Sequence, residues 1–232
     1  MLDLHTHILP GMDDGSRNVE QSLAMLAMQV QQGVDAVALT PHYTANQESP
    51  AEFVQRRRIA EQALRSAIGD KPGMPRLIPG AEVAYFDGIS RAEETPLLCL
   101  ENTRAMLVEM PFCRWSSRML AELEELRNMR RIQPVMAHVE RYLAFQERDI
   151  VEQLLDRGMW IQVNSTFFLR WQTSGKAMRM LREGCIHFIG SDSHNLKERA
   201  PDLGQAMARI EKKLGREALE FLAQREKLLL EG

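Results

Sequence analysis

Short apolar segments alternate with longer amphipathic segments along most of the chain, and this alternation limits the fold more than any other feature. The apolar segments have the length of strands, at residues 1–5, 34–40, 76–85, 103–110, 133–139, 160–165 and 185–192. Helix-length segments follow them, at 19–32, 50–68, 116–130, 147–158, 173–184, 202–214 and 216–229. Repeated strand–helix units predict parallel strands joined by right-handed helical crossovers. We therefore expect an α/β fold of about seven strands, as a closed or nearly closed barrel or, alternatively, a doubly wound open sheet.

The length of the chain and the lack of linker-like segments favour one domain. A chain of 232 residues is ordinary for a single α/β barrel. No Gly/Ser-rich linker, low-complexity segment or repeat separates the strand–helix units, so we expect a single domain over residues 1–232. Local signals agree with the alternation, because Asn18 or Ser16 can cap the first helix and residues 69–75 are typical of a loop.

Composition argues against several classes of function. The 29 basic and 32 acidic residues give a formal charge of −3, so no basic excess indicates nucleic-acid binding. No apolar run approaches the roughly 18 residues of a membrane span, and Asp3, His5 and His7 interrupt any signal-peptide core. We expect a cytoplasmic protein without membrane insertion. Three scattered cysteines make no disulfide framework, and none has the arginine six residues on that a cysteine-dependent phosphatase needs.

Histidines and carboxylates gather near the carboxyl ends of the predicted strands. They are five of the six histidines and four acids: His5, His7, His42, His138, His194, Asp14, Glu82, Glu109 and Asp192. Active sites of parallel α/β folds are built at that end of the strands. We therefore expect residues far apart in the sequence to meet at one rim.

The set favours a metal site, although each piece alone has another interpretation. His5 and His7 alternate along a strand and so point to one face, as a pair of core or surface histidines also could. Glu82 and Glu109 lie inside apolar strands, where a buried carboxylate is costly unless it is paired or metal-bound. Nitrogen and oxygen donors without sulfur suit Mn, Fe or Zn. Nine candidates exceed the need of one ion, so we predict two or three ions bridged by carboxylates.

Two arginines lie close to this set. Arg141 follows His138 by three residues, and Arg199 follows His194 by five. Arginine beside a metal-lined rim is suited to bidentate binding of phosphate. A surface salt bridge is the alternative for each, and the neighbouring metal ligands favour phosphate.

Two further polar residues are expected to have other roles. Asp13 precedes Asp14 in the loop sequence G-M-D-D-G, where an acid commonly forms a turn. His187 lies inside the last predicted strand, five residues before Asp192. We expect His187 to be a core histidine or one that supports a ligand.

The ordered motifs resemble a known superfamily. HTHILPGMDDG, TPHY, GAEV, VEMP, AHVERY, QVNS and SDSHN are similar to those of the polymerase-and-histidinol-phosphatase (PHP) superfamily. Within it, the chain resembles the bacterial manganese-dependent protein tyrosine phosphatases of capsule and exopolysaccharide operons, from Met1 to at least Arg199. The resemblance implies a distorted, TIM-like (β/α)₇ barrel of the PHP type.

The resemblance also implies a trinuclear metal site, with Mn²⁺ as the expected ion and Fe or Zn as alternatives. One ion would be held by His5, His7, Glu82 and Asp192, a second by Glu82, Glu109 and His138, and a third by Asp14, His42 and His194. Arg141 and Arg199 match the phosphate-binding arginines of the family. If the leaving group needs a proton, Asp14 or a metal-bound water is the candidate donor.

The substrate implied by the resemblance is the phosphotyrosine-rich tail of a cognate tyrosine autokinase, and the enzyme would thereby regulate polysaccharide biosynthesis. The chain departs from the family after His42, where a second histidine is common and this chain has Tyr43. The loop that follows, residues 44–50, should border the substrate groove, so Tyr43 is a candidate substrate contact.

Two alternatives stay open at this stage. A small-molecule phosphatase, such as a histidinol-phosphate phosphatase, would carry much the same metal site. A metal-stabilised binding module without turnover would resemble the degenerate PHP domains attached to polymerases, although the filled ligand set argues against it. The sequence leaves open the metal bound in the cell, the cognate kinase and the oligomeric state.

Overall fold

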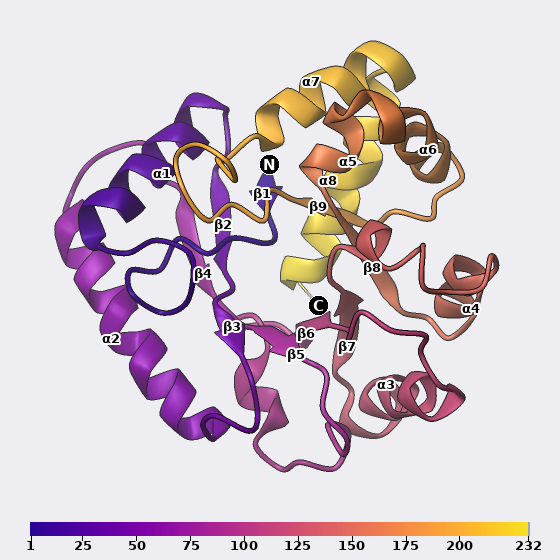
Figure 1. The fold of residues 1–232 in the computed structure, drawn as a ribbon. Helices are drawn as coiled ribbons and strands as arrows, with labels where there is room; N and C mark the ends of the chain where they lie inside the picture. The colour runs from indigo at the N-terminus through magenta and orange to yellow at the C-terminus, as the bar shows by residue number, and fades with distance from the viewer. Residues whose placement is uncertain (232) are drawn as a thin grey trace.

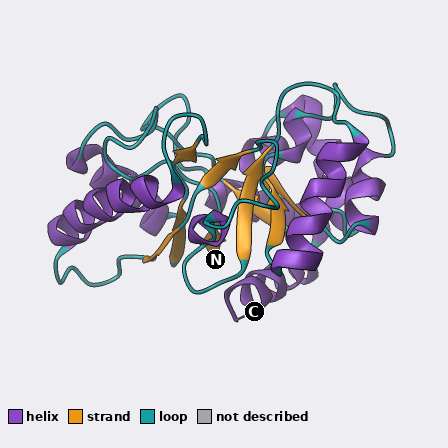
Figure 2. Cartoon of the chain, turned by 90° about the horizontal axis from the view of Figure 1, so that it is seen from below, coloured by secondary structure: helices purple, strands orange, loops and turns teal. Residues whose placement is uncertain are grey.

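The computed structural model describes residues 1–231, in which all strand pairs are parallel. The strands are β1 (Leu2–Asp3), β2 (Ala36–Leu39), β3 (His42–Tyr43), β4 (Arg76–Pro79), β5 (Glu82–Ala84), β6 (Ala105–Glu109), β7 (Gln133–Met136), β8 (Trp160–Asn164) and β9 (Phe188–Gly190). They form a three-stranded sheet in the order β1-β2-β4 and a six-stranded sheet in the order β3-β5-β6-β7-β8-β9. Helices surround the strands (Figure 1) and flank them on both sides in the view from below (Figure 2).

The helices confirm the predicted amphipathic segments. They are α1 (Val19–Gln31), α2 (Pro50–Ile68), α3 (Ser117–Arg130), α4 (Ile150–Asp156), α5 (Ser165–Leu169), α6 (Trp171–Arg182), α7 (Leu203–Leu214), α8 (Arg216–Glu231) and the 3₁₀ turns η1 (Thr95–Leu98) and η2 (Val139–Arg141). Asn18 caps α1, and Ser49 and Glu52 form a reciprocal capping box at the start of α2. The short elements β3, α5, η1 and η2 were not predicted.

Prolines interrupt the sheet at two neighbouring places. Segment 76–85, predicted as one strand, forms β4 and β5 in different sheets, so that prediction is wrong. The break follows Pro79. The neighbouring segment of the same chain is interrupted at the same level by Pro41, between β2 and β3. Proline has no N–H to donate to the sheet. The two segments stay adjacent across the break, because Gly80 N donates to Leu39 O at 2.9 Å and Glu82 N donates to Pro41 O at 3.0 Å.

The segments that follow the first strand, β1, and the last strand, β9, lie next to each other. Thr6 and Ser193 form an isolated parallel bridge. His7 N donates to Ser193 O at 2.9 Å, and Asp192 N donates to His5 O at 2.8 Å. The chain thus has a mixed α/β fold with a curled parallel sheet, which agrees with the predicted fold class.

Alternate side chains of the strands enter two apolar clusters. Val37 and Leu39 belong to the large cluster shared with the outer helices, whereas Ala36 and Ala38 belong to a smaller one. The smaller cluster also receives Leu229 from α8. Helix α8 therefore covers the amino ends of the strands and leaves the carboxyl ends for polar residues. Among residues 1–231, no helix combines the length and apolar character needed to cross a membrane.

Candidate metal centre

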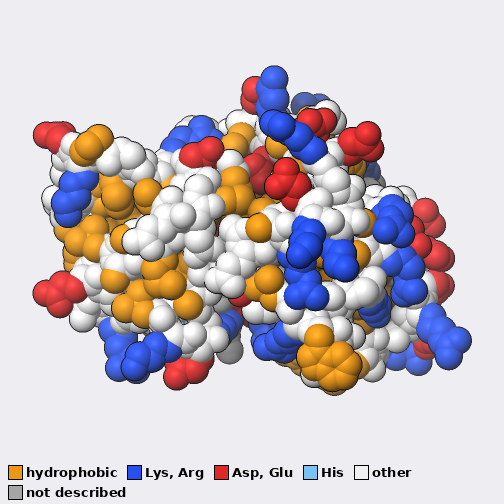
Figure 3. All heavy atoms as spheres, turned by 90° about the horizontal axis from the view of Figure 1, so that it is seen from above, with side chains coloured by type: hydrophobic (Ala, Val, Ile, Leu, Met, Phe, Trp, Pro, Cys, Tyr) orange, Lys and Arg blue, Asp and Glu red, His pale blue; other side chains and the backbone are white. Residues whose placement is uncertain are grey.

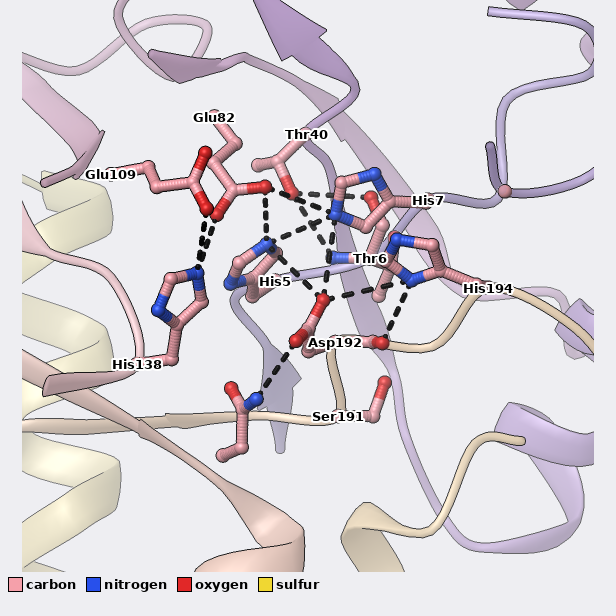
Figure 4. A network of polar contacts seen from close by, with 12 residues as sticks. His5, Thr6, His7, Thr40, Glu82, Glu109, His138, Ser191, Asp192 and His194 are labelled. Carbon is pink, nitrogen blue, oxygen red and sulfur yellow. Dashed lines mark hydrogen bonds and ion pairs between the residues drawn. The ribbon is translucent and has the colours of Figure 1, made fainter. Parts of the chain in front are cut away.

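The nine predicted ligands converge at the carboxyl ends of the strands. Figure 4 shows the part of the cluster around Glu82, with His5, His7, Glu109, His138, Asp192 and His194. His5, His7 and Asp14 follow β1, His42 lies in β3, Glu82 begins β5, Glu109 ends β6, His138 follows β7, and Asp192 and His194 follow β9. They fall into four overlapping groups, and within each group the nitrogen or oxygen donors lie within 4.8 Å of one another. The curl of the sheet thus brings together residues separated by up to almost the whole chain.

Glu82 stands at the centre of the cluster and is 1% exposed. Its Oε2 lies 3.0 Å from His42 Nδ1, 3.1 Å from His5 Nε2 and 3.2 Å from His7 Nε2. Its Oε1 lies 2.8 Å from His138 Nε2. One carboxylate therefore reaches four histidines, from β3, from the segment after β7 and from the segment after β1.

Asp14 and the half-buried His42 form the part of the cluster that faces solvent. The buried His194 lies beside Asp14. Asp14 Oδ1 lies 3.3 Å from His194 Nε2 and 3.6 Å from His42 Nε2. The side chain of Asp14 is 65% exposed, whereas that of His194 is 3% exposed. The donors thus run from a buried centre at Glu82 to an open mouth at Asp14.

The family resemblance implies three sets of ligands, one for each ion. The four groups defined by donor distance share residues with those sets but are not identical to them. His42 faces Glu82 with Nδ1 and Asp14 with Nε2, so its ring joins two groups. His7 belongs both to the group of Asp14 and to that of Asp192. Residues shared between groups are what bridging between neighbouring ions would require.

The contacts within the cluster fit a cation better than they fit hydrogen bonding. Glu82 Oε2 is buried and makes no hydrogen bond within residues 1–231, despite the three histidine nitrogens around it. His5 Nε2 lies 3.1 Å from His7 Nε2. Burial and the neighbouring charge of Glu82 raise the pKa of Glu109. Carboxylates held this close repel one another unless a positive charge lies between them.

The electrostatics of the cluster give two of the candidates, His194 and Asp192, the protonation states of metal ligands. Burial and the charge of His7 lower the pKa of His194 to about 4, so its imidazole is neutral near pH 7. Burial alone would raise the pKa of Asp192, but the charges of His5 and His7 overcome it and lower the pKa to about 2. Neutral imidazoles and ionised carboxylates are the forms that coordinate metal.

Two of the ligand candidates have left-handed backbone conformations. His138 has φ 31° and Asp192 has φ 52°. Such values are uncommon for residues other than glycine, and they persist where the surrounding structure enforces them. Here they turn the chain sharply at the ends of β7 and β9, so that both side chains enter the cluster.

Two polar residues of β8 orient these ligands, and the sequence interpretation did not identify them. Gln162 Oε1 accepts a hydrogen bond from His138 N at 2.7 Å and lies 3.3 Å from His5 Nδ1. Gln162 Nε2 donates to Asn164 Oδ1 at 3.1 Å, and Asn164 Nδ2 donates to Asp192 Oδ2 at 2.8 Å. Partners of this kind fix the orientation of metal ligands. The available signal was a pair of amides two residues apart in the buried strand WIQVNS.

Two acids outside the ligand set hold residues of the cluster in place. Asp13 Oδ2 lies 2.7 Å from His7 Nδ1 and accepts a hydrogen bond from His42 N at 3.0 Å. Asp3 is fully buried and accepts from Ser191 N at 2.8 Å. Asp13 therefore orients a candidate ligand, and Asp3 ties the start of the chain to the segment after β9.

Both predicted phosphate arginines reach the cluster through Asp192. Arg199 Nη2 lies 2.6 Å from Asp192 Oδ1, and Arg141 Nη1 lies 3.6 Å from Asp192 Oδ2. Each arginine side chain is 40% exposed. Two guanidinium groups thus flank the donor cluster and stay open to solvent.

Tyr43 lies away from the mouth of the cluster. It is 1% exposed and belongs to the large apolar cluster, and its ring packs edge-on against Phe53 at 5.3 Å. His42 and Tyr43 are consecutive in β3, so their side chains point to opposite faces. The predicted contact of Tyr43 with substrate is therefore not supported by this geometry.

His187 stands apart from the cluster. Its Nδ1 accepts a hydrogen bond from Ile161 N at 3.1 Å, and the residue is 7% exposed. Burial and the charge of Arg225 lower its pKa to about 4. The unfolded chain, with a histidine pKa near 6.5, binds this proton at higher pH than the native state does. Stability is therefore lost as pH falls from 6.5 toward 4.

His187→Asn is expected to make the protein less sensitive to acid. The asparagine oxygen can still accept from Ile161 N but does not titrate. Between pH 7 and 4.5, the free energy of unfolding of the unmodified chain should fall roughly 2–3 kcal/mol more than that of the variant. Denaturant titrations of both proteins at the two pH values measure this difference. Equal losses would show that the protonation of His187 is not coupled to unfolding.

The comparisons with known proteins agree on one group. The family model described as capsular polysaccharide synthesis, CpsB/CapC, matches residues 1–229. The tyrosine-protein phosphatase YwqE of Bacillus subtilis is 30% identical, over 99% of this chain and 91% of its own length. The tyrosine-protein phosphatase CpsB of Streptococcus pneumoniae is 31% identical, over 93% of this chain and 91% of its own length.

A solved structure shows the same fold. It comes from a study of YwqE from Bacillus subtilis and CpsB from Streptococcus pneumoniae, which describes them as metal-dependent tyrosine phosphatases. The TM-score is 0.88 at 27% sequence identity, and the alignment covers 100% of this chain and 94% of the other. Its likeness spans the whole strand–helix framework that holds the donor cluster. The chain therefore belongs to the CpsB/CapC family of capsular polysaccharide synthesis.

Proposed function

We propose that this chain is a metal-dependent protein-tyrosine phosphatase that hydrolyses phosphotyrosine on a cognate bacterial tyrosine autokinase. The observation that carries the proposal is the pair of guanidinium groups of Arg141 and Arg199, both held against Asp192 at the edge of the donor cluster. Arginine forks bind phosphate oxygens and neutralise their charge. Through its kinase, the enzyme would regulate capsular or extracellular polysaccharide biosynthesis in the cytoplasm.

The cofactor of the proposed enzyme is a set of three divalent ions, with Mn²⁺ first and Fe or Zn as alternatives. The nine donors listed above would hold them, with Glu82 bridging. Such ions supply Lewis acidity and lower the pKa of coordinated water. The proline breaks also support the proposed architecture, because β2 with β3 and β4 with β5 each count as one interrupted strand. On that count, residues 1–232 form one domain with a distorted (β/α)₇ barrel of the PHP type.

The side chains of this protein would divide the remaining work. Arg141 and Arg199 would hold the phosphoryl oxygens and orient the phosphorus toward the cluster. Asp14 lies at the exposed mouth, beside the path of the leaving oxygen, and would serve there as a ligand. A phenolate leaves comparatively easily, so solvent water would supply its proton.

An aromatic surface beside Arg141 favours an aryl phosphate as substrate. The guanidinium of Arg141 lies 5.0 Å from the centroid of the Phe112 ring. Phe112 is 46% exposed, and Phe145, 47% exposed, lies 6.2 Å from it. A phosphate held by Arg141 would place a tyrosine ring near this surface, where aromatic rings attract one another. An alkyl phosphate such as histidinol phosphate would gain less.

Phe112→Ala is expected to reduce the preference for aryl phosphates. A lost aromatic contact is worth roughly 0.5–1.5 kcal/mol, so kcat/KM for a phosphotyrosine peptide should fall about 3- to 10-fold. The value for a phosphoserine peptide should change by less than about twofold. Phe145→Ala, which keeps the ring next to Arg141, is the matched control and should have the smaller effect. An equal fall for both peptides would contradict a contact with the substrate ring.

The proposal is tested by turnover of a phosphotyrosine peptide and of histidinol phosphate, with Mn²⁺ and after chelation. Faster hydrolysis of the peptide, lost with chelator and restored by Mn²⁺, is the expected result. Preference for histidinol phosphate would favour the small-molecule phosphatase. Absence of turnover with either substrate and with p-nitrophenyl phosphate would favour a binding module.

A further inference from the structure

A cavity of about 720 Å³ opens beside the donor cluster and extends away from it. Arg141, Asp192 and Arg199 line the end nearest the cluster. Arg170 and Lys197 line the same cavity. We call this space the lateral cavity. It lies among α5, the start of α6 and the loop 195–202, and it is distinct from the group of donors around Glu82.

The loop that carries Arg199 also carries Lys197, and it is held in a fixed shape. Asn195 Oδ1 accepts hydrogen bonds from Lys197 N at 2.9 Å and from Arg199 N at 3.1 Å. His194 N donates to Arg199 O at 2.9 Å. One short loop thus presents two cations to the lateral cavity, of which only Arg199 contacts Asp192.

The other two cations of the lateral cavity have no close partner. Within residues 1–231, the side chains of Arg170 and Lys197 make neither a hydrogen bond nor an ion pair within 4.0 Å. Arg170 does lie near enough to Asp202 for its charge to act on that carboxyl group. Figure 3, which views the molecule from the side of α7, shows Lys and Arg side chains gathered over the half that contains α5 to α7. An anionic group is the missing partner that this charge distribution favours.

Three acids besides Asp192 line the lateral cavity. Asp202 accepts a hydrogen bond from Ser165, and burial raises its pKa to about 6. Glu140 accepts from Asn164 N at 3.1 Å. Glu198, on the exposed loop, is the remaining carboxylate of the wall. The wall thus carries charges of both signs, and Arg170 and Lys197 are its cations without an ion-pair partner within residues 1–231.

We propose that Arg170 and Lys197 form a second anion-binding subsite for the substrate peptide. It would hold a phosphate or carboxylate of a neighbouring residue while Arg141 and Arg199 hold the phosphate to be cleaved. The inference rests on the proposed phosphatase function and adds a substrate class, peptides with a second anionic group near the phosphotyrosine. The volume supports it, because 720 Å³ is the size of a pocket for a drug-sized ligand and exceeds what one phosphate needs.

The test compares three peptides of one length: a single phosphotyrosine with neutral neighbours, the same peptide with a second phosphotyrosine, and the same peptide with a glutamate there. The unmodified chain should show a KM about tenfold lower for at least one of the doubly anionic peptides. Preference for both identifies any anion as the ligand, and preference for the second phosphotyrosine alone identifies phosphate. Equal KM values for all three would overturn the proposal.

Variants assign the effect to the subsite. Arg170→Ala with Lys197→Ala should abolish the preference and leave kcat/KM for p-nitrophenyl phosphate within about twofold. Arg216→Ala with Lys227→Ala removes two cations from surface pairs on α8 and should leave the preference intact. Glu198→Gln removes the opposing charge and should strengthen it. Retention of the preference in the first double variant would overturn the proposal.

Equilibrium binding separates this proposal from the proposed function. Fluorescence anisotropy of the labelled peptides reports the subsite even if no peptide is hydrolysed. Tighter binding of a doubly anionic peptide, lost in Arg170→Ala with Lys197→Ala, supports the subsite whatever the turnover. Turnover of the single phosphotyrosine peptide without any binding preference would support the phosphatase and contradict the subsite.

Discussion

Replacing Glu82 with glutamine is expected to reduce turnover of a phosphotyrosine peptide by roughly 10³-fold or more. The carboxylate is the shared neighbour of four histidines and is 1% exposed. Glutamine keeps the shape but removes the charge that would hold cations between those histidines. Steady-state assays with Mn²⁺ and metal analysis of the purified variant should show activity and bound metal falling together.

The matched control is Glu122→Gln, which neutralises another buried carboxylate that contacts none of the candidate ligands. Glu122 is 3% exposed and accepts hydrogen bonds from Tyr85 Oη at 3.1 Å and Gly88 N at 2.9 Å. This change should lower the melting temperature and leave metal content and turnover nearly intact. If Glu82→Gln keeps more than about a tenth of the activity, Glu82 does not hold the catalytic metal.

The convergence of the candidate ligands could be predicted because it follows from where they lie along parallel strands. His138, Asp192 and Glu109 come at or just after the ends of apolar segments, and parallel strands carry such residues to one edge. The sequence therefore indicates which side chains meet. Their pairing could not be predicted, since His42 turns its two nitrogens to different carboxylates. That choice depends on the backbone turn at each strand end, as with φ 52° at Asp192.

The break in the sheet and the buried amides were harder to predict. Pro41 ends a predicted strand, whereas Pro79 lies inside the apolar segment 76–85. Only the parallel pairing of their neighbours shows that both breaks fall at the same level. Gln162 and Asn164 lie in a strand whose other residues are apolar, so their role appears only when His138 and Asp192 are placed beside them. Tyr43 shows the opposite error, because its neighbour His42 faces the site and Tyr43 faces the core.

The buried carboxylates of the cluster repel one another, and this electrostatic cost favours a bound cation. Glu82, Glu109 and Asp192 bring three carboxylates into a space that is largely closed to water. Without cations, protonated histidines must compensate this charge, and the pKa of His7 rises to about 10 through Asp13 and Glu82 even though burial opposes it. Divalent ions would replace those protons and free the imidazoles for coordination.

Arg199→Ala is expected to lower kcat/KM for a phosphotyrosine peptide about 100-fold or more, the usual cost of removing a donor to the charge of a transition state. Arg199 is the better placed of the two arginines, because it lies 2.6 Å from Asp192 while Arg141 lies 3.6 Å away and also stacks on Phe112. Metal content should stay unchanged. Arg199→Lys should recover only part of the rate, since an ammonium cannot form the bidentate contact.

The control and the readouts decide between a phosphate contact and a structural role for Arg199. Arg216→Ala removes an equally charged side chain from an exposed pair on α8 and should leave kcat/KM unchanged. Metal analysis and melting temperature should match between Arg199→Ala and the unmodified chain. Loss of metal together with activity would assign Arg199 to holding Asp192 in place, and activity within about threefold of normal would remove Arg199 from the phosphate site. Parallel loss of affinity for inorganic phosphate, a competitive inhibitor in this scheme, would place the missing contact on the phosphate itself.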